Sequence, residues 1–496
     1  MTRRDITIAT FIAIITLLMR VACMEHAPLL YDSGNFFLAA DDFNISHDRP
    51  HLPGYYLHVY TIKLFRLVVE PFVANVAPSI MWSALGCAVL YLLARRFTGT
   101  RESLFVALLI ATNPLVWFFG CTSEVYSFDL FFSVTLLYVG LHPRLLLATP
   151  LLMAFALGVR QSSPVLLLPV YIWLWVSPYR TEQIPIKYIV VSHVLAGILL
   201  CAWLLPMLNT CGGLQAYIAL YHTHNPLTQA GIMQNIVVMA SYAVYTMPAF
   251  VVLYIWIYAK ASPSAKSSDK TLTMALRLWL VIPVGFFALE FYGKGYFLLC
   301  IATLPLFVIH RLRTVPVWGL IGIVAMQVLV FVFAPTQNTN ADIWVRTGMS
   351  QSSATSKVVQ RVRSVYAPVY SQLHYMNSAH TFADSVLLHN KQPYVFVDPT
   401  FPLSSRALQA HHPEQTFVTL LVRENGKLQF HHHRDIHISE GLRSVLDSCI
   451  ILTTANFTQR YGIGYFTELQ QYNNLQICTT NNTDSTALLY NNLFVK

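Results

Sequence analysis

Four charged side chains lie next to long apolar segments of this 496-residue sequence, in places where a charge could do chemistry. Two are carboxylates, Asp32 and Glu124, and two are cations, Arg160 and Lys294. A charge in or beside a membrane helix is costly, so such residues are functional candidates. Brought to one membrane face, they would suit a reaction on a substrate with a lipid-embedded tail and a polar head. The glycines that flank Lys294 also allow its ammonium to approach a lipid phosphate.

Each of these residues also has a purely structural interpretation. Asp32 precedes Ser-Gly, which is common in turns and helix caps, and Lys294 could be an interfacial anchor. Asp129 could simply pair with a neighbouring helix, and Arg20 could extend from the first helix to the water interface. The sequence is compatible with both interpretations.

Clustered histidines raise the question of a metal site. His222 and His224 flank a single residue, and His431–His433 form a run of three. No third ligand follows at a defined spacing, and the eight cysteines lack spacings typical of metal sites. Solvated histidines are therefore the favoured interpretation. The sequence predicts no defined metal site and no certain cofactor.

The composition indicates the environment of this chemistry. Hydrophobic residues make up 55% of the chain and charged residues 11%, with a mean hydropathy of +0.51, whereas a soluble domain has about 25% charged residues. Apolar runs of about 15–25 residues match the hydrocarbon thickness of a bilayer. We therefore expect a polytopic α-helical membrane protein, and an ordinary cytosolic enzyme is excluded. The net charge of +9 does not indicate nucleic-acid binding, because most basic residues lie in short loops between apolar runs.

The apolar runs predict about eleven transmembrane helices. The first follows two arginines and is expected to be an uncleaved helix with its N-terminus in the cytosol. The segment Gly54–Val69 is too short to span comfortably and carries Lys63 and Arg66, so we expect an interfacial helix within a first outer loop of residues 24–73. The expected spans are 6–23, 74–94, 103–119, 124–141, 145–159, 163–177, 188–207, 233–258, 272–289, 295–309 and 315–334.

The basic residues select between this topology and its inverse. With Gly54–Val69 in the interface, fourteen basic residues face the cytosol and six lie near the outer side, which is the usual asymmetry of membrane proteins. Counting the segment as a span would invert every later loop. The cytosolic group is Arg3, Arg4, Arg95, Arg96, Arg101, Arg144, Arg180, Lys187, Lys260, Lys266, Lys270, Arg277, Arg311 and Arg313.

An odd number of spans places residues 335–496 outside the cytosol, after a transmembrane domain of residues 1–334. We expect this polar tail to form an extracytoplasmic α/β domain with a helix near Val358–Met376 and a hairpin turn at Glu424–Lys427. Cys449 and Cys478 could form a disulfide there, because oxidising conditions allow one. The expected strands are Tyr394–Val397, Phe417–Val422, Leu428–Phe430, Cys449–Thr453 and Leu475–Thr479.

Two motifs in the N-terminal part resemble the GT-C membrane glycosyltransferases. Tyr31–Asn35 (Tyr-Asp-Ser-Gly-Asn) followed by His51–Tyr55 (His-Leu-Pro-Gly-Tyr) is similar to their first outer loop, especially in a branch that includes a eukaryotic protein O-mannosyltransferase. That branch has Gly in place of Tyr31, Glu in place of Asn35 and Pro in place of Leu52. The change to Asn35 removes a second carboxylate from the motif.

Three further segments extend the resemblance. Asn113–Trp117 with Ser123–Tyr126 is similar to the family's Pro-x-x-Trp and Glu-Val-Tyr segment entering the fourth helix. Leu157–Gln161 is a weaker match, and Lys294–Pro305 resembles the basic-x-Tyr…Pro helix of lipid-linked sugar transferases. The resemblance covers about residues 1–330 and does not extend to the tail.

The resemblance implies an inverting enzyme that moves a sugar from a polyprenyl-phosphate donor to a protein, lipid or glycan acceptor on the periplasmic or luminal face. It implies that Asp32 is the general base for the acceptor. Glu124 would orient the acceptor, bind the sugar or help to hold a divalent metal ion, and Arg160 and Lys294 would stabilise the leaving phosphate. The other implied substrate-binding residues are His51, Tyr55, Tyr126, Gln161 and Tyr296.

Two other functions remain compatible with the sequence. A flippase for a lipid-linked intermediate would predict inverted repeats and broken helices at mid-membrane, and a non-catalytic scaffold would explain Asn35. A bacterial inner membrane with a periplasmic C-terminus fits the compact size. The endoplasmic reticulum is the alternative, where three N-glycosylation sequons, at Asn44, Asn456 and Asn481, would face the lumen.

Overall fold

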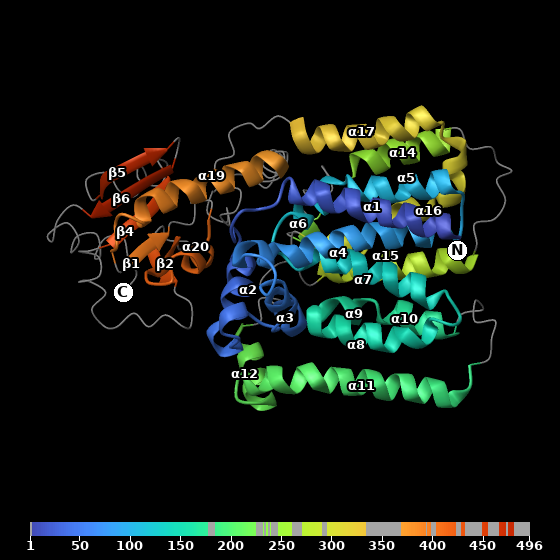
Figure 1. Cartoon of the computed structure of the whole chain (residues 1–496), viewed down its shortest axis with the longest axis horizontal. Helices are drawn as coiled ribbons and strands as arrows, with labels where there is room; N and C mark the ends of the chain where they lie inside the picture. The colour runs from blue at the N-terminus through green and yellow to red at the C-terminus, as the bar shows by residue number, and fades with distance from the viewer. Residues whose placement is uncertain are drawn as a thin grey trace.

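The computed structural model describes two connected parts, a long helical bundle and a smaller mixed sheet with its helices (Figure 1). The described residues are 2–176, 184–224, 232, 235, 236, 239, 247–259, 270–289, 295–333, 369–392, 394–397, 403–422, 428–431, 449–454, 466–472 and 475–480. Lys294, and the segment 334–368 with the expected domain boundary, lie outside them.

The bundle consists of apolar helices that run roughly along one axis (Figure 1). Each expected span coincides with helical segments, although the described part of span 233–258 is mainly 248–259. The helices are α1 (Arg3–Val21), α4 (Pro71–Ala94), α5 (Thr100–Ala111), α6 (Pro114–Gly120), α7 (Tyr126–Gly140), α8 (Thr149–Val159), α9 (Ser162–Leu166), α10 (Leu168–Val176), α11 (Ile186–Asn209), α14 (Pro248–Ala259), α15 (Lys270–Leu289), α16 (Thr303–Phe307) and α17 (Val317–Phe333).

Three of these helices are individually long and apolar enough to cross a membrane among the residues described: 71–94, 186–209 and 272–289. The expected span 103–119 is a bent pair instead, with 63° between α5 and α6. Asn113 causes the break, since its side chain caps the amide of Leu115 and Pro114 begins the new helix. Several other apolar helices have 10–17 residues.

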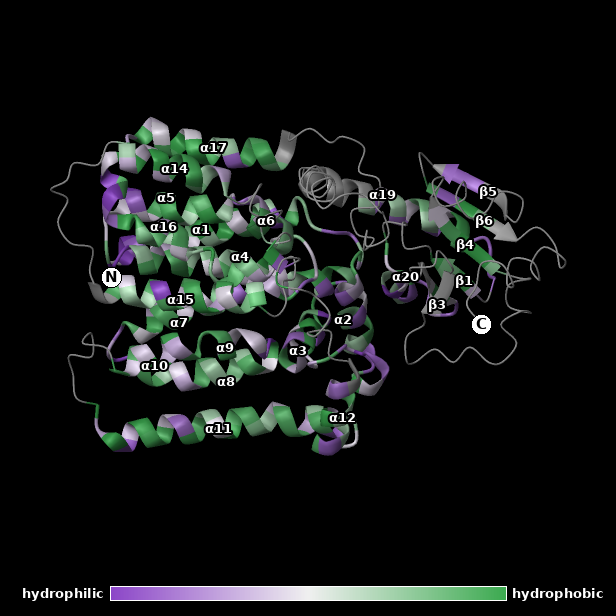
Figure 2. Ribbon diagram, turned by 180° about the vertical axis from the view of Figure 1, so that it is seen from behind, coloured by the Kyte–Doolittle hydropathy of each residue, from purple (hydrophilic) through white to green (hydrophobic). Residues whose placement is uncertain are grey.

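The basic ends of the bundle helices meet at the end that carries the N-terminus (Figure 1). Arg95 is 2.8 Å from Asp5, and Arg96 donates to the carbonyl of Leu141 at 2.9 Å. Figure 2 shows mainly hydrophobic residues along the helices and hydrophilic residues in α2 (Tyr31–Asp41) and α3 (Tyr56–Phe65) at the opposite end. The structure therefore separates the basic end from the first long loop, as the charge pattern predicts.

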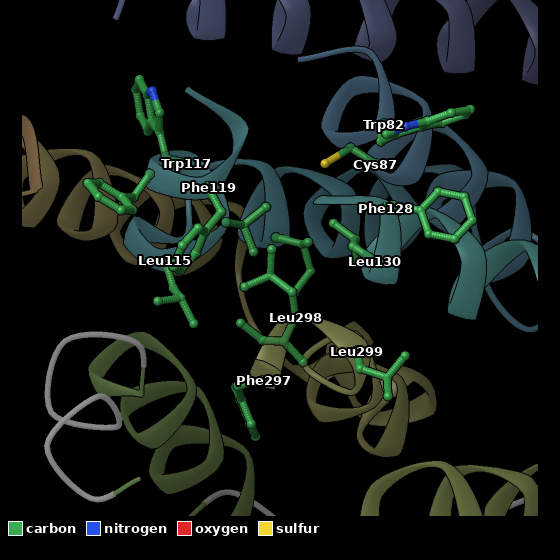
Figure 3. Close-up of a cluster of buried hydrophobic side chains, with 14 of the residues drawn as sticks. Trp82, Cys87, Leu115, Trp117, Phe119, Phe128, Leu130, Phe297, Leu298 and Leu299 are labelled. Atoms are coloured by element: carbon green, nitrogen blue, oxygen red, sulfur yellow. The ribbon is translucent and has the colours of Figure 1, made fainter. Parts of the chain in front are cut away.

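An aromatic and aliphatic core holds the central helices together. Side chains of α4, α6, α7 and the turn η4 (Tyr296–Leu299) form one buried cluster (Figure 3). Trp82 contacts Phe131 in a stacked arrangement at 4.9 Å and Phe128 edge-on at 5.4 Å. Such ring pairs fix the rotation of α4 against α7, and with it the direction of the polar residues at their ends.

The first long loop contains short helices at the end of the bundle far from the N-terminus (Figure 1). They are α2, the single turn η1 (Ile45–His47) and α3, with α12 (Leu214–His224) nearby. A helix of 10 residues such as α3 extends for about 15 Å, half of the hydrocarbon thickness of a bilayer. The helix α3 alone is therefore too short to cross a bilayer, and its place in the interface stays a prediction.

A six-stranded sheet forms the C-terminal part, in the order β3-β2-β1-β4-β6-β5. Its three central strands are parallel, and β2 and β3 pair as the predicted hairpin, with Val422 opposite Leu428. The sequence missed β5. The expected helix near 358–376 overlaps α19 only over residues 369–376, because 358–368 lie outside the described residues and α19 continues to Leu387. The elements are α19 (Val369–Leu387), β1 (Tyr394–Val397), α20 (Ser405–His411), β2 (Thr416–Val422), β3 (Leu428–His431), β4 (Cys449–Thr454), β5 (Phe466–Tyr472) and β6 (Leu475–Thr480).

The structure contains no disulfide between Cys449 and Cys478. The two residues lie on the neighbouring strands β4 and β6, but Ile451, and not Cys449, is opposite Cys478. Diagonal neighbours in an antiparallel pair are about 7–8 Å apart, which exceeds the reach of a disulfide. The disulfide that the sequence left open is therefore not formed in this register.

Candidate active site

Asp32 lies in the first turn of α2, and its side chain is 32% exposed. The helix begins after Leu30, which supplies no side-chain cap, so a negative charge in the first turn interacts favourably with the helix dipole. The carboxylate Oδ1 is 3.4 Å from Nε2 of His51. This carboxylate is therefore accessible and touches an imidazole from the second half of the same motif.

A chain of hydrogen bonds orients His51. Nδ2 of Asn35 is 3.3 Å from Nδ1 of His51, and Oδ1 of Asn35 accepts from Nε of Arg406 at 2.7 Å. Because an arginine can only donate, it fixes the amide so that Asn35 donates to His51. Nε2 of His51 then carries the proton and faces Asp32. We call this series, from Arg406 through Asn35 and His51 to Asp32, the Asp32 hydrogen-bond chain.

Arg406 comes from α20 of the C-terminal part and is completely buried. Its Nη2 also donates to the carbonyls of His47 and Asp48 in the first loop, at 3.1 and 3.3 Å. α20 packs directly on α2, and a Cβ at Gly34 would lie 2.7 Å from the backbone of Arg406. The glycine of the Asp-Ser-Gly motif therefore permits this close approach. Sequence reasoning missed Arg406, because nothing local connects it with Asn35, 371 positions away.

Glu124 lies beside α2 and is 3% exposed. Its Oε1 accepts from the hydroxyl of Ser33 at 3.1 Å, and its backbone carbonyl accepts from Ser79 at 2.6 Å. Because Ser33 directly follows Asp32, Glu124 lies next to the start of the helix that carries Asp32.

A buried carboxyl group that the sequence did not single out supports the same loop. Glu25 is 2% exposed, and its Oε1 accepts from the backbone amide of Ser123 at 2.8 Å and also from the Ser123 hydroxyl. Burial raises the pKa of Glu25 from 4.5 to about 8, although the hydrogen bonds from Ser123 oppose this. Glu25 thus carries a proton at neutral pH and holds the residue next to Glu124.

Arg160 forms a buried ion pair with Asp129. Asp129 also accepts from the hydroxyl of Ser163, so the pairing that the sequence allowed for this aspartate is present. The Arg160 guanidinium carbon lies 4.8 Å from the ring centre of Tyr126 and 4.4 Å from that of Tyr296. Both tyrosines are predicted substrate-binding residues, and the structure gathers them around this cation.

Tyr55 ends the second half of the first-loop motif and packs on His51. It has a positive φ of 42° after Gly54 at 115°, and it lies 5.0 Å from the ring of His51. Burial raises its pKa well above the usual 10, and the charges of Asp32, Glu124 and Arg160 all act on its hydroxyl.

The loop before Tyr55 is also fixed, because the carbonyl of Pro53 accepts from Gln161 at 3.3 Å and from Tyr217 at 3.1 Å. All predicted site residues that the structure describes thus lie around the first loop, and Lys294 is outside the described residues. In the described part, neither Asp32 nor Glu124 belongs to a group of three His, Cys, Asp or Glu side chains close enough to share a metal ion.

Comparisons with known proteins identify the fold. The structure resembles that of ArnT from Cupriavidus metallidurans in the apo state, with a TM-score of 0.58 and 12% sequence identity over 97% of this chain and 98% of that chain. It also resembles ArnT from the same organism bound to undecaprenyl phosphate, with a TM-score of 0.56 and 11% identity over 95% and 97%. No family model and no curated protein sequence matches. The likeness confirms the GT-C fold that the sequence predicts.

Proposed function

We propose that this protein is an integral-membrane glycosyltransferase that moves a sugar from a polyprenyl-phosphate donor to an acceptor outside the cytosol. One observation carries the proposal: Asp32 contacts His51 of the first loop, and its neighbour Ser33 donates to Glu124, in a fold shared almost end to end with a protein crystallised with undecaprenyl phosphate. The acceptor is a hydroxyl or amino group of a protein, lipid or glycan.

Asp32 is the general base in this proposal. The acceptor proton moves to the Asp32 carboxylate while the acceptor atom attacks the anomeric carbon, and the bond from that carbon to the phosphate oxygen breaks. One displacement by one nucleophile inverts the anomeric centre. His51 supports this role because its Nε2 proton faces the carboxylate and holds it in one orientation.

Glu124 and the cations complete the proposed reaction. Glu124 binds a sugar or acceptor hydroxyl, which its place beside Ser33 supports. Arg160 contributes positive potential for the leaving phosphate, although Asp129 shares its charge. Lys294 is the second proposed phosphate ligand, and His51, Tyr55, Tyr126, Gln161 and Tyr296 line the substrate site.

We also propose a bacterial inner membrane with the C-terminal part in the periplasm. The meeting of the basic residues at the end of the bundle opposite to α2 supports this orientation. The endoplasmic reticulum membrane with a luminal C-terminal part is the alternative, and glycosylation of Asn44 in a eukaryotic host would test the non-cytosolic placement of the first loop that both share.

The test is consumption of donor. Purified protein in lipid nanodiscs is incubated with a panel of radiolabelled polyprenyl-phosphate sugars and acceptor extract. We expect one donor to be consumed, and we expect D32N to bind that donor but not turn it over. The matched control is D42N, because Asp42 follows the same helix as its C-cap, is exposed and pairs with the half-buried Arg49. If no donor is consumed or hydrolysed, the enzyme proposal is wrong, and movement of donor between leaflets would then indicate a flippase.

A further inference from the structure

A group of imidazole and carboxylate side chains lies where α19 meets α20, outside the candidate active site. His380 and Asp384 are four residues apart on α19 and therefore share a helix face, and His411 ends α20. One ligand atom from each of the three lies within 4.8 Å of the others. The rings of His380 and His411 are 3.9 Å apart between centres. His411 comes from a different helix than His380 and Asp384, which explains why spacing alone did not predict the group.

Two ring nitrogens in this group are left without a hydrogen bond. Nε2 of His380 and Nε2 of His411 are buried, and neither has a partner in the described part of the chain. A buried polar atom without a partner costs free energy. The neutral imidazole nitrogen is also the commonest metal ligand in proteins. A bound cation would supply the partner that both nitrogens lack.

Neighbouring side chains already orient the ligand atoms. Nε2 of His412 is 2.7 Å from Oδ1 of Asp384, and Nδ1 of His380 is 3.3 Å from Oδ2 of the same carboxylate. The ring of Phe72 stacks on His411 at 4.4 Å. Metal sites use such outer contacts to fix ligand orientation.

We propose that His380, Asp384 and His411 bind a divalent transition-metal ion, with Zn²⁺ as the best match. Two imidazoles and a carboxylate are ligands that Zn²⁺ accepts at about 2.0–2.2 Å. Ligand atoms in a tetrahedral site of that size are about 3.3–3.5 Å apart, so small side-chain rotations close the site. His412 orients the carboxylate, and water takes the open position.

The ion fixes α20 against α19. His411 is at the C-terminal end of α20 and Arg406 is near its start, within a helix of 7 residues. Metal binding therefore stabilises the helix that supplies Arg406 to the Asp32 hydrogen-bond chain. The site itself is independent of the proposed glycosyl transfer, and its occupancy can be measured without any activity assay.

The experiment measures metal bound to the full-length protein, produced without a polyhistidine tag. After incubation with Zn²⁺ and dialysis, we expect one equivalent of zinc by mass spectrometry of metals, and visible absorption bands after replacement by Co²⁺. The variant H380Q/H411Q should lose this equivalent. H389Q is the matched control, since His389 lies just beyond α19, is absent from the group of three ligands and contacts the carbonyl of Ser385. The triple variant at His431–His433 tests the other histidine run, and it should keep the zinc.

A measurement on the unchanged protein protects the test against misfolding of the variants. We expect EDTA to lower the melting temperature and Zn²⁺ to restore it, because a ligand of the folded state stabilises it. The proposal is overturned if H380Q/H411Q retains as much zinc as H389Q. It is also overturned if the unchanged protein binds no zinc and its melting temperature does not respond to either reagent.

Discussion

Asp32 and Asp129 lie in the first turns of two helices, α2 and α7, and their surroundings are opposite. The Asp32 side chain is 32% exposed and contacts the imidazole of His51 at 3.4 Å. The Asp129 side chain is completely buried, paired with Arg160 and bonded to Ser163. A carboxylate that is fully satisfied by protein groups is poorly suited to accept a proton from substrate, whereas an accessible carboxylate oriented by one neighbour is well suited. This comparison suits Asp32 to a role in the reaction and Asp129 to a role in stabilising the structure.

The largest expected effect is the loss of turnover in D32N, which removes the carboxylate assigned to the reaction. Removal of a general base typically costs about 100- to 10,000-fold in rate. Stability should change by less than about 0.5 kcal/mol, since the side chain is partly exposed and loses one weak contact. Steady-state turnover and thermal unfolding of the same preparation check both parts. If D32N instead unfolds much more easily, and its turnover falls only as much as the fraction of folded protein, then Asp32 has a structural role.

D129N should show the reverse pattern. The amide leaves the buried guanidinium of Arg160 without a negative partner, and breaking a buried pair in this way costs about 3–5 kcal/mol. Unfolding in mixed micelles measures the free energy. S163A is the matched control, because it removes only one neutral donor from the same carboxylate and should cost about 1 kcal/mol. Equal stability of D129N and the unchanged protein would show that the pair is not structural.

R406K sharpens the comparison, because it acts on Asp32 indirectly. Lysine keeps the charge but lacks the fork that reaches Asn35 and the two loop carbonyls. His51 should lose its fixed orientation, and small misplacements cost up to about 100-fold in rate. We therefore expect kcat to fall by about 10- to 100-fold with KM nearly unchanged. R49K is the control in the same loop. A rise in KM without loss of kcat would assign Arg406 to substrate binding instead.

The sequence could predict what is encoded locally. The lengths of the apolar runs predicted the spans, and the positions of the basic residues predicted which loops lie at the same end of the bundle. The Asp-Ser-Gly and Glu-Val-Tyr segments indicated Asp32 and Glu124. The fold is confirmed, but the roles of these residues stay predictions. The strand β5 was missed because its sequence, Phe466–Tyr472, is mostly polar.

Contacts between distant segments could not be predicted in the same way. Asn35 replaces the glutamate of the resembling family, and only the structure shows that its amide joins Arg406 to His51. Glu25 was equally inconspicuous, because its partner Ser123 is 98 positions away. No hydropathy or spacing rule reports such pairs, since they arise when separate helices pack. Residues that position other residues, such as Asn35 and Glu25, are therefore the ones that could not be predicted from the sequence.

The last comparison concerns Glu25, a third carboxyl group, which is buried like Asp129 but has no ion pair in the part of the chain that the structure describes. Its pKa is about 8 in the folded protein and 4.5 when exposed. Between these values the folded protein keeps a proton that the unfolded chain releases, so the stability of the unchanged protein falls as the pH rises through this window and levels off above about 8. E25Q keeps the acceptor for Ser123 and has no proton to lose. The melting temperature of E25Q relative to the unchanged protein should therefore increase as the pH rises from 4.5 to about 8, while D42N shows no such trend. A difference that stays constant across this range would mean that Glu25 is ionised in the folded protein and that a cation compensates it.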